Sequence, residues 1–454
     1  MARRKALYFY SLLVTLLLAG VLAACGDENK NLPANSNLEV VTAASVSTAT
    51  SSATTASATT AQTTTATTTT VASATTSDTT AASASTTAAT SAAATTADNT
   101  TAASTKAATT SAATTKAASA TTAAAQTNPG QIKKGVLLEP MSWEAQTWNN
   151  CAPMSAKMAL SYFGINVSQA ECGKALRPNG GDKNDPVGDK HVEPYELVNY
   201  ITGKGLKTKI VENGTFDQLR ALLSAGVPVI TQQWLHDNDD IAHYRVARGY
   251  DLATNVIIFN DSMDRKPNTI ADIKTQEKLW KAYDHRFLPV YTAAQAPAVN
   301  AILGEDANPD ANMSRALAAA TKYAAANPGD IDGWRNLGYL QSASGDCKGA
   351  IQTWENHITK MLTPSDNGPY NRFLWYQFWP VVCYNQLGNY NQVIKMVPNE
   401  IEHAKVFAEA RYQYAVALVG LGRKDEAVTQ LKKALLDDNA YQPIYTLMSK
   451  LGVS

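Results

Sequence analysis

The chain has 454 residues, with 39 Lys and Arg against 39 Asp and Glu, so its formal net charge at pH 7 is zero. It contains no basic run, which argues against nucleic acid as a partner. Five cysteines in a chain of this length are too few for a disulfide scaffold.

Residues 1–25 have the pattern of a secretion signal. Three basic residues at positions 3–5 precede an apolar stretch over residues 8–24, which ends in Leu22-Ala23-Ala24-Cys25. This ending resembles a bacterial lipobox, in which Cys25 is diacylated and becomes the mature N-terminus. An uncleaved membrane anchor is the alternative, because the apolar stretch is nearly long enough to span a bilayer. Both alternatives place the rest of the chain outside the cytoplasm, on the cell membrane.

Residues 26–130 are predicted to form a disordered tether. From about residue 40 to residue 126 the sequence is almost entirely Ala, Ser and Thr, which cannot bury a core. As a flexible coil, about 90 residues would span on the order of 50 Å. We therefore expect this segment to hold the folded part away from the membrane. Its threonine density is compatible with O-glycosylation.

Cys151 stands at the start of a predicted helix. Pro153 suits the first helical turn, because the N–H that proline lacks has no partner there. Met154 and Met158 recur at helical spacing, and Gly164 is a plausible stop. A thiol at a helix N-terminus lies in the positive end of the helix dipole, which favours the thiolate. Cys151 is therefore a candidate nucleophile, and a small buried thiol is the alternative.

Helices and strands follow in the order expected of an α+β domain. We predict a helix over residues 194–204, then a second helix that starts with the capping box of residues 215–218 and ends at Gly226. A buried strand is predicted over residues 227–234. Cys172 is expected to be a small buried residue.

A predicted hairpin supplies the partners that a cysteine nucleophile needs. Its strands cover residues 244–250 and 256–259, joined by a short polar segment. His243 opens the first strand and Asp261 follows the second, so an antiparallel pair makes them neighbours. Docked near Cys151, they complete a set of nucleophile, base and orienting group. A histidine in the core at a strand start is the alternative for His243.

A metal site is a weaker hypothesis for the same region. His236, the acidic residues up to Asp240, and His243 lie close in sequence but show no known ligand spacing. A solvated acidic loop is the favoured interpretation, and we expect no metal or cofactor. His191, in a Gly/Asp-rich loop, is expected at the surface or at the rim of a substrate site.

Three segments together resemble the papain-like cysteine peptidases of the C39-like group, which are related to bacteriocin-leader peptidase domains. The segments are Gln146-Thr-Trp-Asn-Asn-Cys151-Ala-Pro, His243-Tyr-Arg-Val-Ala-Arg-Gly-Tyr-Asp251 and Asn260-Asp261. The resemblance covers about residues 135–291 and implies a papain-like α+β domain over residues 131–292. It further implies that Cys151 is the nucleophile, His243 the general base and Asp261 its orienting partner. Gln146 would donate to the oxyanion hole beside the Cys151 N–H. The family usually has glycine where this chain has Ala152.

A 34-residue period begins after Tyr291. The signature positions of a tetratricopeptide repeat are occupied by Trp334, Leu337, Gly338, Gly345, Ala350 and Trp354, with further matches at Ala316, Pro328, Tyr384, Gly388, Gly422, Ala427 and Ala434. This resemblance implies an all-α tetratricopeptide-repeat solenoid over residues 297–451, with three full repeats, one partial repeat and a concave face for a protein partner.

Two further features lie in this repeat region. Its dense aromatic group is expected to fill the seam beside the degenerate third repeat, with a peptide-binding patch as the alternative; it consists of Tyr370, Phe373, Trp375, Tyr376, Phe378 and Trp379. A disulfide between Cys347 and Cys383 is the less favoured alternative to two free thiols.

The sequence thus predicts an extracytoplasmic, lipid-anchored cysteine peptidase that hydrolyses peptide amide bonds through an acyl-thioester, with repeats for protein interaction. A catalytically inactive papain-like lipoprotein that binds peptides as a scaffold is the main alternative. A transamidase or peptidoglycan amidase on the same fold is a third hypothesis.

Overall fold

The computed structural model describes residues 38–43, 130–178, 180, 191–237, 241–362, 372–404 and 406–453, together with Leu32. The predicted signal with Cys25, most of the predicted tether, the acidic residues 238–240 and the insertion at residues 363–371 lie outside the described residues. Among the described helices, none is both long enough and apolar enough to cross a bilayer.

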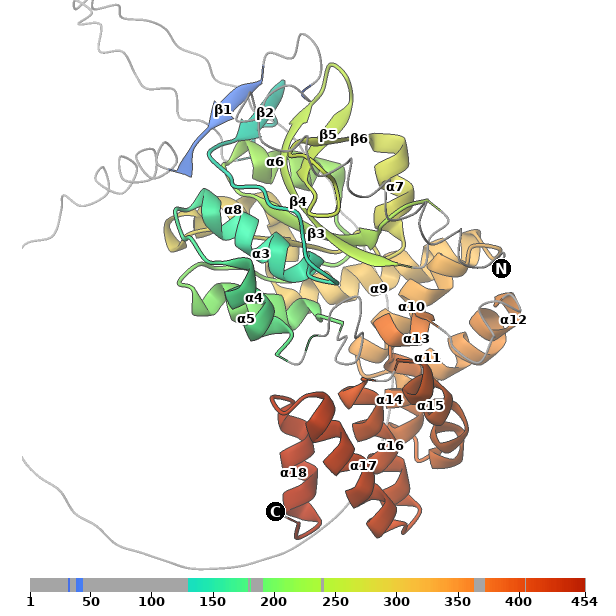
Figure 1. The fold of residues 1–454 in the computed structure, drawn as a ribbon. Helices are drawn as coiled ribbons and strands as arrows, with labels where there is room; N and C mark the ends of the chain where they lie inside the picture. Colours follow the sequence, from blue (N-terminus) through green and yellow to red (C-terminus); the bar gives the residue numbers. More distant parts are fainter. Residues whose placement is uncertain are drawn as a thin grey trace, which may run out of the picture. The chain divides into compact units, whose positions relative to one another are not determined.

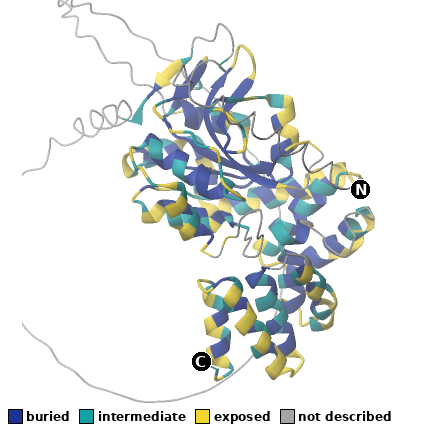
Figure 2. Ribbon diagram, viewed as in Figure 1, coloured by how far each residue is buried: buried dark blue, intermediate teal, exposed yellow. Residues whose placement is uncertain are grey.

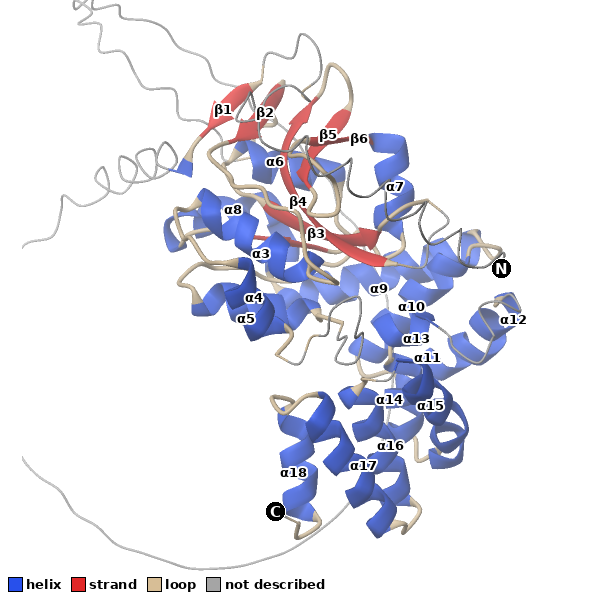
Figure 3. Cartoon of the chain, in the orientation of Figure 1, coloured by secondary structure: helices blue, strands red, loops and turns tan. Residues whose placement is uncertain are grey.

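Seven strands of the described part of the chain form one mixed sheet (Figures 1 and 3). They are β1 (Glu39–Val41), β2 (Gly135–Leu138), β3 (Val229–Trp234), β4 (Ala242–Asp251), β5 (Val256–Asn260), β6 (Thr269–Asp272) and β7 (Phe287–Pro289). The long strand β4 is central: β3 pairs with its first half and β2 with its last three residues, while β5 pairs along its other edge. The predicted hairpin is therefore confirmed as β4 and β5. The side chains of both strands are buried throughout, as Figure 2 shows.

Helices lie between and after these strands in the sequence. They are α3 (Cys151–Tyr162), α4 (Gln169–Leu176), α5 (Pro194–Gly203), α6 (Phe216–Ser224), α7 (Ile273–Lys281) and α8 (Ala296–Leu303), with a short 3-10 turn, η1 (Ala293–Gln295), before the last. Helix α3 contacts β3 and β4, and α6 contacts β2, β3 and β4. The expected helix starts at Cys151, and Gly164 follows it with a φ of 74°. The capping box of Thr215 and Gln218 is also confirmed.

The first strand differs from the sequence prediction, because it belongs to the predicted tether. β1 pairs in parallel with β2, in register Glu39↔Val136 to Val41↔Leu138. The Val41 side chain is buried, and the Val41 carbonyl accepts from the Glu139 N–H at 3.0 Å. Glu39 also forms an ion pair with Lys133 at 2.7 Å. Backbone pairing and one buried valine therefore fix residues 38–43 on the edge of the sheet, where composition alone indicated coil.

The rest of the described chain is helical, drawn in orange to red in Figure 1. Its elements are η2 (Gly304–Ala307), α9 (Pro309–Ala326), α10 (Ile331–Ala343), α11 (Cys347–Thr353), a π-helical turn η3 (Trp354–Ile358), α12 (Thr359–Met361), α13 (Arg372–Tyr376), α14 (Trp379–Gln386), α15 (Tyr390–Ala404), α16 (Ala408–Gly420), α17 (Lys424–Asp437) and α18 (Gln442–Lys450). We call residues 309–453 the helical region.

Helix pairs in this region turn at the predicted glycines. Gly345, Gly388 and Gly422 separate α10 from α11, α14 from α15 and α16 from α17, and each has a positive φ of 73° to 85°. Gly338 lies against the Trp379 ring, where an added Cβ would come within 2.4 Å of a ring carbon. The positive φ angles of the three turn glycines and the close approach of Gly338 to a ring explain why glycine stands at these positions. The assignment of the region to the tetratricopeptide family stays a prediction.

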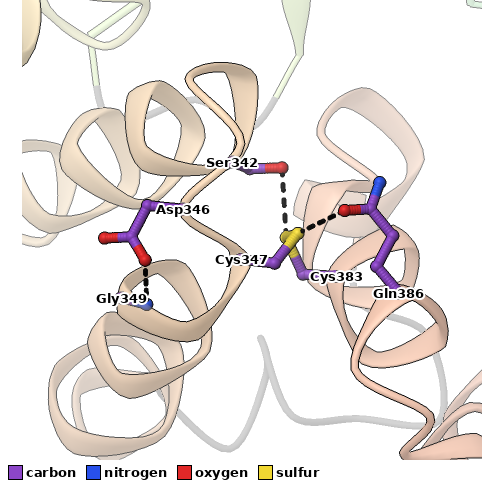
Figure 4. Close-up of a disulfide and its surroundings, with 6 residues drawn as sticks. All are labelled: Ser342, Asp346, Cys347, Gly349, Cys383 and Gln386. Carbon is purple, nitrogen blue, oxygen red and sulfur yellow. Dashed lines mark hydrogen bonds between the residues drawn. A yellow bond between two sulfur atoms is a disulfide. The ribbon is translucent and has the colours of Figure 1, made fainter. Parts of the chain in front are cut away.

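Cys347 and Cys383 form a disulfide, which corrects the preference for two free thiols. It joins the start of α11 to α14, two neighbouring helices that already pack together (Figure 4). The Ser342 Oγ lies 3.2 Å from the Cys383 sulfur. Both cysteines are buried, so the cross-link lies inside the helical region.

The aromatic residues predicted to fill the repeat seam pack in two different places. Phe373 stacks on Trp354 with ring centroids 6.1 Å apart, and Trp379 meets the same tryptophan edge-on at 6.0 Å. These rings fill the seam of the helical region, as expected. Tyr376 instead packs against the sheet, next to Trp234 at the end of β3. Tyr370 lies outside the described residues.

Candidate active site

The turn before α3 places Cys151. Asn149 has a φ of 51°, a left-handed conformation that asparagine tolerates better than most residues. The buried Arg177 holds this turn: its Nη1 donates to the Trp148 carbonyl and to Asn150 Oδ1, both at 2.8 Å. A half-buried cysteine thus starts the helix on a turn that a buried cation fixes in place.

His243 and Asp261 meet at the same end of the hairpin. His243 is the second residue of β4, and Asp261 directly follows β5. The His243 Nε2 lies 2.7 Å from Asp261 Oδ1, and both side chains are buried. Since Nε2 faces the carboxylate, the other ring nitrogen remains for the cysteine.

Arg245 is the second partner of Asp261, and the sequence analysis gave it no role. Its Nε donates to Asp261 Oδ2, and its Nη2 donates to the Leu235 carbonyl at 2.9 Å. The Met263 N–H also donates to Asp261 Oδ1 at 2.8 Å. The only signal in the sequence is spacing, because residues 243 and 245 lie on the same face of a strand. The carboxylate is therefore held on both oxygens.

Cys151 lies next to His243, whose hydrogen bonding and charge both act on the pKa of the thiol. Burial on its own raises the pKa of the Cys151 thiol, but this hydrogen bond and the charge of His243 bring the pKa below its usual value. Backbone groups of Tyr244 and Ala152 act in the same direction. The site thus favours a thiolate on Cys151.

The pKa of the His243 imidazole is shifted in the opposite direction, upward. Burial is the largest single effect and acts to lower the pKa of His243, but the charge and hydrogen bond of Asp261, together with those of Cys151, outweigh it and raise the pKa to about 9. The pKa of Asp261 is lowered well below its usual range, because the opposing effect of burial is smaller than the attraction to His243 and Arg245. A thiolate beside an imidazolium is the charge state that this arrangement favours at neutral pH.

Gln146 is held by Ser262, the residue after Asp261. The Gln146 N–H donates to the Ser262 carbonyl at 2.9 Å, and the Ser262 hydroxyl donates to Gln146 Oε1 at 2.8 Å. The hydroxyl fixes the orientation of the amide, with its oxygen toward Ser262 and its Nε2 donor away from it. The sequence analysis did not single out Ser262, whose only signal is its position beside Asp261.

A hollow of about 610 Å³ lies beside the nucleophile turn. It is lined by Glu144, Thr147, Trp148, Asn150, Ser168, Gln169, Ala170, Gly173, Lys174, Arg177, Pro178 and Gly180. The Trp148 ring is 43% exposed, and Met263, two residues after Asp261, is 49% exposed. The hollow therefore reaches Asn150, the residue before Cys151, and exposed apolar side chains stand on the segments that precede Cys151 and follow Asp261.

The remaining predicted residues lie elsewhere. Cys172 is buried, with its sulfur 3.2 Å from the Tyr200 hydroxyl, and burial raises the pKa of its thiol. His191 is not an open surface residue, since its ring meets Tyr376 edge-on at 5.1 Å. In the part of the chain that the structure describes, no three His, Cys, Asp or Glu side chains are arranged to hold a metal ion.

Comparison with known proteins finds a family model that matches one segment of this chain. Residues 138–287 match the model of the Peptidase C39-like family. The match supports a C39-like peptidase domain. It spans the nucleophile turn, the β4–β5 hairpin and the sheet up to β7, and it lies within the predicted limits of residues 131–292.

Solved structures similar to this chain include three peptidases at low identity. A C39-like peptidase from Bacillus anthracis is 16% identical, with a TM-score of 0.29, and the alignment covers 35% of this chain and 98% of that one. The double-glycine-motif protease of an AMS/PCAT transporter, in complex with the leader peptide, is 15% identical over 34% of this chain and 93% of that one, with a TM-score of 0.24. The peptidase domain of Streptococcus ComA, a bifunctional ABC transporter, is 15% identical over 34% and 99%, with a TM-score of 0.26. A search of curated protein sequences found no significant match.

Proposed function

We propose that this chain is a cysteine peptidase that hydrolyses peptide amide bonds with a Cys151–His243–Asp261 triad. The observation that carries the proposal is the His243–Asp261 hydrogen bond of 2.7 Å, with the Cys151 side chain beside the same imidazole, inside a segment that matches a peptidase family. The three members of the triad come from a helix start, a strand start and the residue after a strand, and they take the roles of nucleophile, base and orienting group.

The reaction proceeds through an acyl-thioester. The Cys151 thiolate attacks the carbonyl carbon of the scissile amide, and the His243 imidazolium gives its proton to the leaving amine as the C–N bond breaks. Water then attacks the thioester, His243 accepts its proton, and the acid product leaves with return of the thiolate. Asp261 holds the imidazole in place throughout, and Arg245 holds Asp261.

The oxyanion of each tetrahedral intermediate needs two donors. The backbone N–H of Cys151 lies in the first turn of α3, where helix geometry leaves N–H groups without an intrahelical acceptor. Gln146 would supply the second donor through Nε2, the end of the amide that points away from Ser262. Ser262 is then the residue that orients this donor.

We further propose that the protein is lipid-anchored through Cys25 on the extracytoplasmic face of the cell membrane. The lipobox-like Leu22-Ala23-Ala24-Cys25 sequence supports the anchor. The disulfide between Cys347 and Cys383 supports the location, because disulfides persist mainly in oxidising compartments. The substrate would be a peptide or protein, and the helical region would bind a protein partner as a set of tetratricopeptide repeats.

The test is chemical labelling of Cys151 followed by kinetics. At pH 6 an ordinary thiol is almost fully protonated, so fast modification of Cys151 by iodoacetamide indicates a thiolate. Cys172 is the internal control, because its buried thiol should stay unmodified. On a peptide substrate panel, Cys151→Ala and His243→Ala should each remove nearly all hydrolysis, and the double variant should be little worse. Activity that survives both changes would place the chemistry elsewhere.

A labelled but inactive Cys151 would favour the peptide-binding scaffold. Release of a new amide instead of an acid would favour the transamidase. Mass spectrometry of the products separates these outcomes from peptide hydrolysis.

A further inference from the structure

The end of β4 that carries His243 is covered by a helix from the far end of the chain. Tyr376, the last residue of α13, packs into a small apolar cluster beside the sheet. The buried members of this cluster are Trp234, Ala242, Leu279, Ala282 and Tyr283. The Tyr376 ring lies 6.3 Å from the Trp234 ring and 5.1 Å from His191, edge-on to both. Ala242 is the residue directly before His243.

A series of contacts connects this cluster to Asp261. Trp234 and Ala242 are register partners at the end of the β3–β4 pair where residues 235–241 connect the two strands. The next residue, Leu235, donates its N–H to the Ile241 carbonyl at 2.9 Å. The Leu235 carbonyl in turn accepts from Arg245 Nη2, and Arg245 Nε donates to Asp261. A shift of Trp234 or Leu235 would therefore move an acceptor that orients Arg245.

Helix α13 presents two different rings to two different neighbours. Phe373, one turn before Tyr376, stacks on Trp354 and lies under the Arg335 guanidinium at 4.6 Å. Phe373 thus belongs to the interior of the helical region, whereas Tyr376 contacts Trp234 at the end of β3. The helix can be weakened at either ring separately, so the chain itself offers a matched pair of substitutions.

The helical region is also fixed to the sheet at a second place, which keeps α13 in register with the hairpin. Lys281, at the end of α7, forms an ion pair with Asp330 at 2.5 Å, and its carbonyl accepts from the Asn336 Nδ2 at 2.7 Å. The buried Arg286 guanidinium lies 4.3 Å from the centre of the Tyr339 ring in α10. These contacts hold α10 beside α7 and the start of β7.

We propose that Tyr376 is a positioning residue for the triad: the helical region uses its ring to hold the His243-bearing hairpin in its working geometry. This inference rests on the proposed peptidase function. It assigns the helical region a part in the chemistry itself, in addition to any partner that it binds.

The experiment measures the rate of Cys151 alkylation by iodoacetamide against pH in the full chain, with peptide mass spectrometry to assign the modified cysteine. We compare the unchanged protein with Tyr376→Ala, Tyr376→Phe and Phe373→Ala. In the unchanged protein the midpoint should lie below that of an ordinary thiol. Tyr376→Ala should raise it by about one pH unit, which lowers the rate at pH 6 about tenfold. Tyr376→Phe keeps the ring and should stay within about threefold of the unchanged protein.

Phe373→Ala is the matched control, because it removes an aromatic ring from the same helix on the other side. It should lower the melting temperature without moving the alkylation midpoint. If Tyr376→Ala does not fold, Tyr376→Leu keeps most of the volume without the ring edges and should give a smaller shift in the same direction. An unshifted midpoint in a folded Tyr376 variant would overturn the inference and leave the peptidase proposal intact. An ordinary thiol midpoint in the unchanged protein would overturn the peptidase proposal, and the inference with it.

Discussion

His243 and Arg245 hold the two oxygens of one carboxylate, with His243 Nε2 2.7 Å from Asp261 Oδ1 and Arg245 Nε on Oδ2. Both basic residues stand on β4, two positions apart, so one strand supplies the imidazole and the guanidinium that hold this carboxylate. The carboxylate cannot rotate toward one partner without leaving the other. A buried, fully ionised Asp261 follows from this pairing.

Replacing Arg245 by methionine should destabilise the protein by about 3 kcal/mol, because it leaves one oxygen of a buried carboxylate without its charged partner. In an Asp261→Asn background the same change should lower the free energy of unfolding by clearly less, since no buried carboxylate is then left without its charged partner. Urea unfolding of the four proteins measures this coupling. Arg423→Met, which breaks an exposed ion pair with Glu426, is the control and should leave the midpoint unchanged. Equal losses in both backgrounds would contradict the pairing.

The triad predicts a bell-shaped dependence of activity on pH. The active form holds a Cys151 thiolate and a His243 imidazolium, so activity should rise as Cys151 loses its proton and fall as His243 loses its own near pH 9. Asp261→Asn removes the charge that raises the pKa of His243, so the descending limb should move to lower pH. Initial rates of peptide hydrolysis across pH 4 to 10 check this. A descending limb that Asp261→Asn leaves in place would assign it to another group.

The same groups make stability depend on pH. The pKa of His243 is above its unfolded value, so its contribution is complete below about pH 6.5 and is lost as the pH rises through 9. The pKa of Asp261 is below its unfolded value, so its contribution is complete above about pH 4 and is lost as the pH falls further. Thermal melts should therefore show the smallest effect of Asp261→Asn in strong acid.

Local patterns in the sequence predicted much of this site's surroundings. Helical spacing placed the start of α3 at Cys151, and strand alternation placed His243 and Asp261 at one end of a hairpin. Neither pattern shows that the other oxygen of Asp261 is taken by Arg245, because period-two spacing gives a face but not the group opposite it. The contact of Tyr376 with Trp234 could not be predicted from the sequence for a different reason. It joins segments that are far apart in sequence, and only the packing of α10 and α13 on the sheet brings them together.

The disulfide should contribute to the stability of the helical region. Cys347 and Cys383 are 36 residues apart, and closing a loop of this length lowers the entropy of the unfolded chain by an amount equivalent to about 3–4 kcal/mol. Replacing both cysteines by serine should lower the unfolding free energy by up to this amount. The control is Cys172→Ser at a buried free cysteine: it keeps the cross-link, so reductant should destabilise it as it does the unchanged protein, whereas the double serine variant should not respond to reductant. Reductant that leaves the melting temperature of the unchanged protein unaltered would contradict a stabilising cross-link.

Lipid attachment at Cys25 is the simplest prediction to check. Changing Cys25 to serine should abolish incorporation of a labelled fatty acid and release the protein from the membrane fraction. Cys172→Ser is the matched control and should keep both the label and the location. Unchanged labelling of the Cys25→Ser protein would show that the lipid is attached elsewhere.

Docking of β1 changes how such an anchor would hold the peptidase. Because residues 38–43 are paired to β2, only residues 26–37 separate Cys25 from the sheet, and about a dozen residues span at most about 40 Å. The Ala/Ser/Thr-rich segment follows β1 in the sequence, so its length would not set the distance between Cys25 and the sheet. Val41 and Val40 test this docking, since Val41 is buried and Val40 is 55% exposed.

Hydrogen exchange of the peptide that contains residues 38–43 is the measurement. In the unchanged protein this peptide should exchange slowly, because its backbone groups are paired with β2 and the Val41 carbonyl with the Glu139 N–H. Val41→Asp puts a charge into a buried position and should make the peptide exchange as fast as unpaired backbone. Val40→Asp places the same charge one residue earlier on the exposed side and should leave the exchange slow. Fast exchange in the unchanged protein would show that residues 38–43 belong to the tether. The segment between Cys25 and the sheet would then be longer.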